Sequence, residues 1–332
     1  MPRFHHAARL AAGVCLVMLA LPIAGAQTAP VQGTNVEAAA SLPRTPDGRP
    51  DFQGVVWTAT SAFFAPFEAG PMMPATLVLP EDEAQKAFGR IMAMFMSPAV
   101  MKTIEEIDPE VSEILKHIKG FPLVRGERHT RLLVLPADGK LPTTPEARRD
   151  MPAGLAIPTL KADNPEDRGA SERCLGMPPP LPVLFDIPMA FVQTPDHVVI
   201  HGEFADARII PFSRKAAGGS VARWEGDTLV IETTGFLARD RVRPLFGGAL
   251  IVNPDAKVIE RYTRASADEL VYQFTVEDPK AYTAPWLAEY SLYRAPYRMY
   301  PTSCHEANYS LGNILRGQRV VDERAARKRQ AG

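Results

Sequence analysis

A histidine and a carboxylate stand two residues apart in a strand-like segment, as His201 and Glu203. Side chains two apart on a strand point to the same face, so this pair would lie side by side. A carboxylate beside an imidazole orients the ring and raises its basicity, which suits a general base near neutral pH. Arg208 follows and could stabilise an anionic oxygen. The same residues would also suit a solvated outer face that carries a polar pair.

Three more residues of this kind are consecutive near the C-terminus: Cys304, His305 and Glu306. We predict that His305 and Glu306 lie at the mouth of the same cavity as the first pair. Together these imidazoles and carboxylates would also suit zinc or iron. Nothing in the spacing brings the two pairs together, so no metal is predicted. A free Cys304 beside a histidine would be a candidate nucleophile, although Cys174 is available as a disulfide partner.

The chain lacks the common cofactor and nucleophile motifs, namely a phosphate-binding glycine loop, a dinucleotide fingerprint, Gly-x-Ser-x-Gly and His-Glu-x-x-His. We therefore expect no cofactor. The leading prediction is a lyase- or isomerase-type enzyme that performs acid/base chemistry on a small, partly apolar molecule. His201 would be the base, Glu203 its orienting group and Arg208 the anion stabiliser. The alternative is a lipocalin-like carrier that binds a small ligand without catalysis. An envelope interaction module, which would expose a broad apolar patch, is a third class.

The composition excludes several partners. The 332 residues include 37 Lys and Arg against 38 Asp and Glu, a formal net charge of −1, so a basic surface for nucleic acid is not expected. Proline is abundant, at 32 residues, which limits long helices and favours loops and strand edges. After the first 26 residues no stretch is apolar enough to span a bilayer, so stable membrane insertion is not expected.

Residues 1–26 have the pattern of a secretory signal peptide. Two arginines form a basic start, an apolar run from Leu10 to Leu21 follows, and Ala24-Gly25-Ala26 is a small-residue cleavage site. The run is shorter than the ~20 residues that a membrane anchor needs. We predict a periplasmic or secreted protein, cleaved near Ala26, whose net charge falls from −1 to −3 with the two arginines. A polar, Ala-rich and flexible lead-in follows at residues 27–42.

Two cysteines remain after this cleavage, Cys174 and Cys304, and thiols in an oxidising compartment usually pair. A bridge between them would close a loop of about 130 residues. In the chain-entropy model such a bridge contributes roughly 4 to 5 kcal/mol. Two unrelated buried thiols are the alternative.

The remaining residues predict one β-rich domain over 43–320, with a helical insertion at about 80–120 and a charged tail at 321–332. In the insertion, acidic residues at 81–83 favour a helix start and apolar residues recur every three or four positions, with further helices beginning at Pro98 and Pro109. Strand patterns cover 52–59, 130–135, 191–194, 198–204, 220–224, 228–234, 257–264, 269–277 and 286–293. Short turns between the later strands permit antiparallel pairing. We predict a mainly β fold, an antiparallel β-barrel or sandwich of lipocalin-like type, with the helical insertion after its first strand.

Several motifs resemble those of a large family of exported bacterial proteins of uncharacterised activity. They are Pro43–Val55 (PRTPDGRPDFQGV), Ser171–Cys174, Val192–Pro195, Arg223–Val230 (RWEGDTLV), Val276–Tyr282 (with EDPKAY), Cys304–Tyr309 (CHEANY) and Asn313–Gly317. The resemblance spans nearly all of the chain after the lead-in. It carries over no catalytic residue, but both cysteines fall inside shared motifs, which supports their pairing.

A second likeness concerns shape. Gly54-x-x-Trp57 at the start of an antiparallel β protein resembles the Gly-x-Trp of lipocalin-type barrels. Those barrels hold small apolar ligands in their mouths, so the likeness implies a small-molecule partner.

Overall fold

A computed structural model describes residues 42–59, 62, 65–70, 73–107, 112, 118–151, 162–169, 171–175, 178–180, 188–203, 207–213, 218–245, 248–300 and 302–331. The expected signal peptide over 1–26 and nearly all of the lead-in over 27–42 lie outside these ranges. Within them, no helix combines the length and the apolarity that crossing a bilayer requires.

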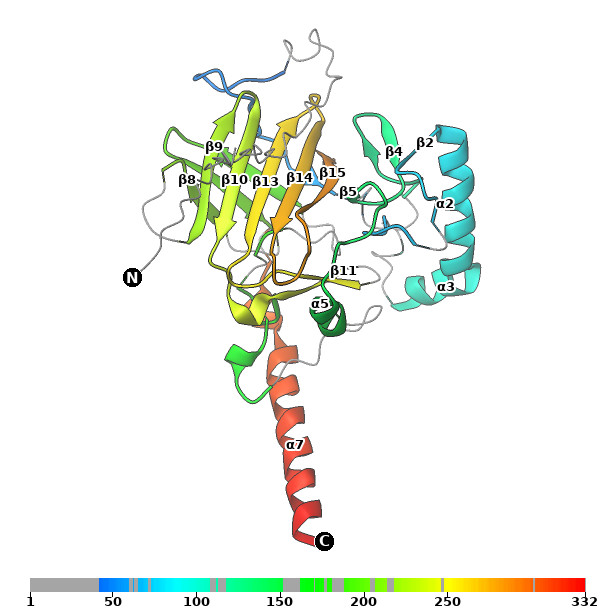
Figure 1. Ribbon diagram of the computed structural model, residues 1–332, viewed down its shortest axis with the longest axis vertical. Helices are drawn as coiled ribbons and strands as arrows, with labels where there is room; N and C mark the ends of the chain where they lie inside the picture. Colours follow the sequence, from blue (N-terminus) through cyan, green and yellow to red (C-terminus); the bar gives the residue numbers. More distant parts are fainter. Residues whose placement is uncertain are drawn as a thin grey trace, which may run out of the picture. The chain divides into compact units, whose positions relative to one another are not determined.

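The largest sheet is antiparallel in every strand pair described (Figure 1). Its strand order is β8-β7-β6-β1-β15-β14-β13-β10-β9, with β5 paired to β15. The strands are β1 Trp57–Thr58, β5 Leu133–Leu135, β6 Met189–Gln193, β7 His197–Gly202, β8 Arg208–Pro211, β9 Gly219–Glu225, β10 Thr228–Thr234, β13 Lys257–Arg264, β14 Glu269–Glu277 and β15 Trp286–Arg294.

Alternating burial explains why these segments are strands. Every second residue of β13 is buried, from Val258 through Glu260 and Tyr262 to Arg264. Between β9 and β10, Gly226 adopts a φ of +59°, which a side chain would strain, and the hairpin register places Thr228 opposite Glu225. The predicted ranges for β10, β13 and β14 are confirmed residue for residue.

The sheet rolls up so that distant strands meet through their inner faces. Five strands separate β8 from β13 in the sheet order, so in a flat sheet these two would lie roughly 29 Å apart. Instead Arg208 on β8 lies 2.6 Å from Glu260 on β13. The edge strands β8 and β9 also approach each other, yet no ladder joins them in the residues described. The fold is therefore mainly β, as predicted, and is a rolled antiparallel sheet without barrel closure.

Trp57 and Arg264 close one end of this roll. Trp57 is fully buried, and its Nε1 donates to the Phe52 carbonyl at 3.0 Å. The Arg264 guanidinium lies over the Trp57 ring, 5.4 Å from its centroid. The same guanidinium donates to the backbone carbonyls of Asp51, Ser266 and Ala267. These contacts fix the segment before β1 beneath the sheet.

The helical insertion follows β1, as predicted. It contains α2 Glu81–Phe95 and α3 Pro98–Ile107, while most of the third expected helix, from Pro109, lies outside the described residues. A small sheet of β2 Val78–Leu79, β4 Glu127–His129 and β3 Leu123–Val124 accompanies the helices. The Tyr293 hydroxyl donates to the Leu123 carbonyl at 3.0 Å, which ties this small sheet to β15.

The other elements are short, apart from the last. They are α5 Pro145–Asp150, η2 Pro165–Asp167, η3 Ser171–Arg173, η4 Ala238–Asp240, β11 Val242–Leu245, β12 Gly248–Ile251, α6 Cys304–Ala307 and α7 Tyr309–Ala331. The predicted tail at 321–332 continues α7 as far as Ala331.

His129 on β4 is a buried histidine, 4% exposed, whose Nδ1 has no hydrogen-bond partner in the part of the chain described. Burial lowers its pKa below 6.5; the charges of Arg125 and Arg131 act in the same direction, and those of Glu289 and Glu127 oppose them. The unfolded chain therefore binds a proton at a pH where the folded protein does not.

We predict that the free energy of unfolding falls as the pH drops below the ordinary histidine pKa, until the pH passes the lowered pKa of His129. Above that range the contribution is fully present. Urea unfolding across a pH series should show that His129→Gln loses less of its free energy of unfolding on acidification than wild type does. The exposed His201→Gln variant should keep the wild-type slope. Equal slopes for wild type and His129→Gln would contradict the assignment.

Candidate functional site

An open pocket of about 530 Å³ lies at the end of the roll that Trp57 and Arg264 close. Its described lining comes from residues 45–47, 49 and 53 of the segment before β1, from 193–195 at the end of β6 and the turn that follows, from Phe212, and from 223–224 at the end of β9. Three of the segments that the sequence marks as motifs, which are far apart along the chain, thus meet around one hollow.

An ion pair holds the first wall. Arg44 makes two bonds to Asp227 in the turn between β9 and β10, at 2.6 and 3.0 Å. The backbone then reverses between Thr45 and Arg49, whose N–H and carbonyl bond at 2.8 Å, with Gly48 at a φ of +81°. Residues 45–49 are therefore held across the end of the sheet instead of leading away from it.

Two glutamines fix the second wall through hydrogen bonds between their side-chain amides and the backbone. The Gln193 N–H donates to Oε1 of Gln53 at 2.9 Å, and the Phe52 N–H donates to Oε1 of Gln193 at 2.7 Å. Nε2 of Gln193 donates to the Pro50 carbonyl at 3.0 Å. Because these bonds occupy the amide groups, the glutamines position the wall.

The pocket's own chemistry comes from two arginines and a tryptophan. Arg49 lies over the half-buried Trp224, with Cζ 5.6 Å from the ring centroid. Arg223 pairs with Glu225 at 2.6 Å, and Arg261 pairs with the other oxygen of that carboxylate at 2.8 Å. Although burial raises the pKa of Glu225, hydrogen bonds from Arg261 and Arg223 bring it below its ordinary value.

The charged residues among the described lining are Asp47, Arg49 and Arg223, a net charge of +1. Oδ1 of Asp47 accepts a bond from the Thr45 hydroxyl at 2.5 Å. A cationic, partly aromatic hollow of this kind suits an anionic small molecule.

A second polar group is buried inside the roll around Glu260, which is 0% exposed. Arg208 donates to both of its oxygens, at 3.1 and 2.6 Å. The hydroxyls of Tyr262 and Tyr272 donate to Oε1 at 3.2 and 3.0 Å. Burial lowers the pKa of Arg208, but the charge and hydrogen bonds of Glu260 outweigh burial and raise it. Burial, followed by the Glu260 charge, raises the pKa of Tyr262.

This arrangement saturates Glu260 with four donors. A carboxylate bonded in this way is a structural acceptor and not a free base. Arg208, predicted to stabilise a substrate anion, instead neutralises a carboxylate of the protein.

The structure does not bring His201, Glu203 and Arg208 together in one cavity. Arg208 is on the inner face, where it pairs in register with the buried Ile200. Since neighbouring residues of β7 alternate, His201 points to the outer face and is exposed. Glu203 is half-buried, and its Oε1 accepts a bond from the Tyr300 N–H at 3.0 Å. The alternation along β7 turns His201 away from the interior, and Glu203 follows the last residue of that strand.

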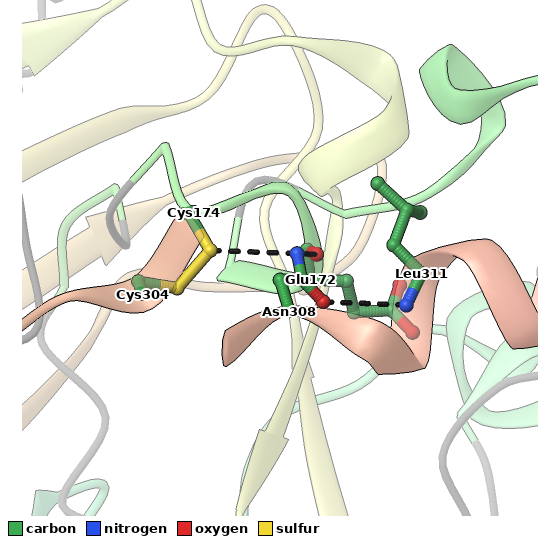
Figure 2. The surroundings of a disulfide bond; sticks show 5 residues. All are labelled: Glu172, Cys174, Cys304, Asn308 and Leu311. Carbon is green, nitrogen blue, oxygen red and sulfur yellow. Dashed lines mark hydrogen bonds between the residues drawn. A yellow bond between two sulfur atoms is a disulfide. The ribbon is translucent and has the colours of Figure 1, made fainter. Parts of the chain in front are cut away.

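The disulfide between Cys174 and Cys304 is confirmed, with 5.7 Å between the Cα atoms. Figure 2 shows Asn308 beside it: Nδ2 donates to the Glu172 carbonyl at 2.8 Å and to Sγ of Cys174 at 3.4 Å. The Leu311 N–H donates to Oδ1 of Asn308 at 3.2 Å. The bridge and this amide together tie α6 and the start of α7 to η3.

His305 and Glu306 lie on α6 and are exposed. In the residues searched, which are those the structure describes, no group of three or more His, Cys, Asp or Glu side chains could hold a metal ion. Among the described residues, no hydrogen bond or ion pair joins His305 or Glu306 to His201 or Arg208.

Sequence reasoning missed Glu260, Arg49 and Trp224 as site residues. Glu260 lies on the same buried face of β13 as Val258 and Tyr262. An acid at one of these inward positions was the signal that the sequence offered. Arg49 belongs to a turn with no periodicity, and its approach to Trp224 is a long-range contact that spacing does not reveal.

Comparison with protein-family models, with curated proteins and with solved structures finds no match to this chain. The site therefore has to be interpreted from its own geometry.

We predict that Arg208→Met destabilises the protein by about 3–5 kcal/mol, because it leaves Glu260 buried without its counter-charge. The double variant Arg208→Met/Glu260→Gln should recover part of that loss. Urea unfolding of the four members of the cycle measures the coupling. As a control, Arg223→Met breaks a pair at the surface and should cost about 1 kcal/mol or less. Similar losses for Arg208→Met and Arg223→Met, or no recovery in the double variant, would contradict the buried-pair account.

Proposed function

We propose that this protein binds a small organic anion in the pocket between the segment before β1 and the end of β9. Of the two leading functions that the sequence suggests, ligand binding is the one that the geometry supports. The observation that carries the proposal is the Arg49 guanidinium stacked on Trp224 at the pocket wall.

Arg49 supports this proposal because no acid of the protein bonds to it in the part of the chain described, although its charge also helps to lower the pKa of Asp227. In the part of the chain described, its guanidinium has the Trp224 ring as its contact and no hydrogen bond or ion pair. A carboxylate that enters the pocket can therefore bond to Arg49 without displacing an acid of the protein. The Trp224 ring beside it offers a flat apolar surface for the rest of the ligand.

The same pocket offers little for acid/base catalysis. No histidine or cysteine occurs among its described lining residues, and its carboxylate, Asp47, already accepts a bond from Thr45. A general base has to reach the proton that it removes. Catalysis through His201, the leading expectation from sequence, gains no support from a side chain on the outer face. Binding or carriage of the ligand is the simpler use of these groups.

We also propose that the protein acts outside the cytoplasm, in the periplasm or the medium, after cleavage near Ala26. The Cys174–Cys304 bridge supports this location, because disulfides persist in oxidising compartments.

Trp224 provides a direct reporter of the pocket. Of the three tryptophans, Trp57 and Trp286 are 0% and 1% exposed, whereas Trp224 is half-buried beside Arg49. We predict that aromatic and aliphatic carboxylates change the tryptophan fluorescence more than the matched neutral amides do. Arg49→Gln should weaken the affinity by about tenfold, equivalent to about 1.4 kcal/mol.

Arg148→Gln is the control for this titration, since Arg148 is exposed on α5 and does not line the pocket. It should bind as wild type does. Equal binding of amides and carboxylates, or unchanged affinity in Arg49→Gln, would refute the proposed role of Arg49.

Export is tested by intact-mass analysis of the protein recovered from the periplasm or the medium. We predict a mature chain that begins at Gln27 and is two hydrogens lighter than its fully reduced form, because of the disulfide. A product in those fractions that retains Met1, or one with two free thiols, would contradict export with cleavage.

A further inference from the structure

Among the residues that the structure describes, three arginines are buried although the acceptors that they bond to carry no formal charge. Arg131, Arg243 and Arg264 are 2%, 4% and 5% exposed, and each guanidinium donates to backbone carbonyls. Carbonyl dipoles solvate a buried cation without neutralising it. Such an arginine serves well as a brace between segments if all of its nitrogens are bonded.

Arg131 and Arg264 meet that condition. Arg131 donates through Nε, Nη1 and Nη2 to the carbonyls of Leu133, Ala75 and Ala137, at 2.9 to 3.1 Å. Arg264 uses the same three nitrogens for the carbonyls that hold the segment before β1. Both arginines are explained as braces.

Arg243 on β11 does not meet this condition, because not all of its nitrogens are bonded. Its Nε donates to the Asp240 carbonyl at 3.1 Å, and its Nη1 donates to the carbonyls of Pro178 and Pro179. Its Nη2 is buried and has no hydrogen-bond partner among the residues described. Two of the nitrogens hold the guanidinium in place, and the third is left as an unused donor.

The surroundings of Arg243 are aromatic and belong to the inner side of the roll. Its Cζ lies 5.3 Å from the centroid of the Phe236 ring. Burial lowers its pKa to about 10, opposed by Asp240 and then by Tyr272, Glu260 and Tyr282. Arg243 therefore keeps its charge at neutral pH.

The nearby acids leave Nη2 without an acceptor. The bond between Arg243 and Asp240 uses the Asp240 backbone carbonyl, so the Asp240 carboxylate acts on Arg243 through its charge. Glu260 already pairs with Arg208, and Tyr282 exchanges two bonds of 3.0 Å with the backbone of Ile251. Tyr282 follows the end of β14 at Glu277, whereas the Arg49 pocket adjoins the opposite ends of the strands, by the turn between β9 and β10. The unused donor thus lies at the other end of the roll from that pocket.

We propose that Nη2 of Arg243 binds the carboxylate of a small apolar monoacid, at a second site separate from the Arg49 pocket. The buried guanidinium has one unused donor, which a negatively charged acceptor would satisfy. A carboxylate supplies the acceptor oxygen that the free N–H lacks. The Phe236 ring beside the guanidinium favours an apolar body on that acid. The inference shares with the proposed function only the idea that the protein binds small organic acids, because the residues involved are different.

The test is isothermal titration of the full mature chain with decanoate, with decanol as the neutral probe of the same length. We expect wild type to bind decanoate at least tenfold more tightly than decanol. Because the Arg49 pocket also favours carboxylates, the decisive comparison uses the Arg49→Gln background, in which adding Arg243→Gln should abolish that preference. Arg49→Gln, which alters only the first pocket, should keep it.

Two further variants cover the case in which Arg243→Gln fails to fold. Arg131→Gln removes a buried arginine whose nitrogens are all bonded, so it should lower stability and leave the preference for decanoate unchanged. Arg243→Lys keeps the charge and should retain a weaker preference.

Three results would overturn the second site. They are equal binding of decanoate and decanol by wild type, an unchanged preference when Arg243→Gln is added to Arg49→Gln, and loss of the preference in Arg49→Gln alone. The last result would assign decanoate to the first pocket and leave the proposed function standing. Conversely, failure of the Arg49 fluorescence test with a preserved Arg243 effect would overturn only the first pocket.

Discussion

The buried contact between Arg208 and Glu260 is the constraint on which the rest of the structure depends. It joins the first strand of the sheet order to the seventh, so the sheet has to roll until the inner faces of β8 and β13 meet. Removing both charges from water costs several kcal/mol per ion. Two bonds from Arg208 and one each from the hydroxyls of Tyr262 and Tyr272 offset that cost at Glu260. Because few other geometries would supply all four donors, the network specifies this roll as well as stabilising it.

The proposed sites follow from the roll because each lies at one of its ends. At one end, Arg264 and Trp57 fix the segment before β1, and Arg44 bonds to Asp227, so that Arg49 reaches Trp224 on a strand far along the chain. At the other end, Arg243 is held by three carbonyls with one nitrogen unused. A flat sheet would bring neither arrangement together. Ligand binding is thus proposed at two arginines whose guanidinium groups keep hydrogen-bond donors without an acceptor in the protein.

Much of the fold could be predicted from local pattern. Period-two alternation gave β13 and β14 their correct bounds, and the cysteine pair was identified from compartment and count. The short strands β8, β11 and β12 were missed, because four residues carry too little periodicity. For the site, the pattern predicted that His201 and Glu203 share a face, but it did not predict that His201 points outward. The apolar residues Val198 and Ile200, on the opposite face of β7, were the signal that His201 points outward. Contacts such as Arg208 with Glu260, 52 residues apart, are set by the roll itself and lie beyond any local pattern.

The most direct test of this account is a distance measured between the two edge strands. Spin labels on cysteines introduced at Ile209 on β8 and Val221 on β9 would sit on outer faces, while Cys174 and Cys304 stay bonded to each other. In the rolled sheet, pulsed electron paramagnetic resonance should give a distance below about 20 Å, since these edges approach each other. Eight strand spacings in an open sheet would instead place the labels roughly 40 Å apart. That longer distance would contradict the roll and, with it, both proposed sites.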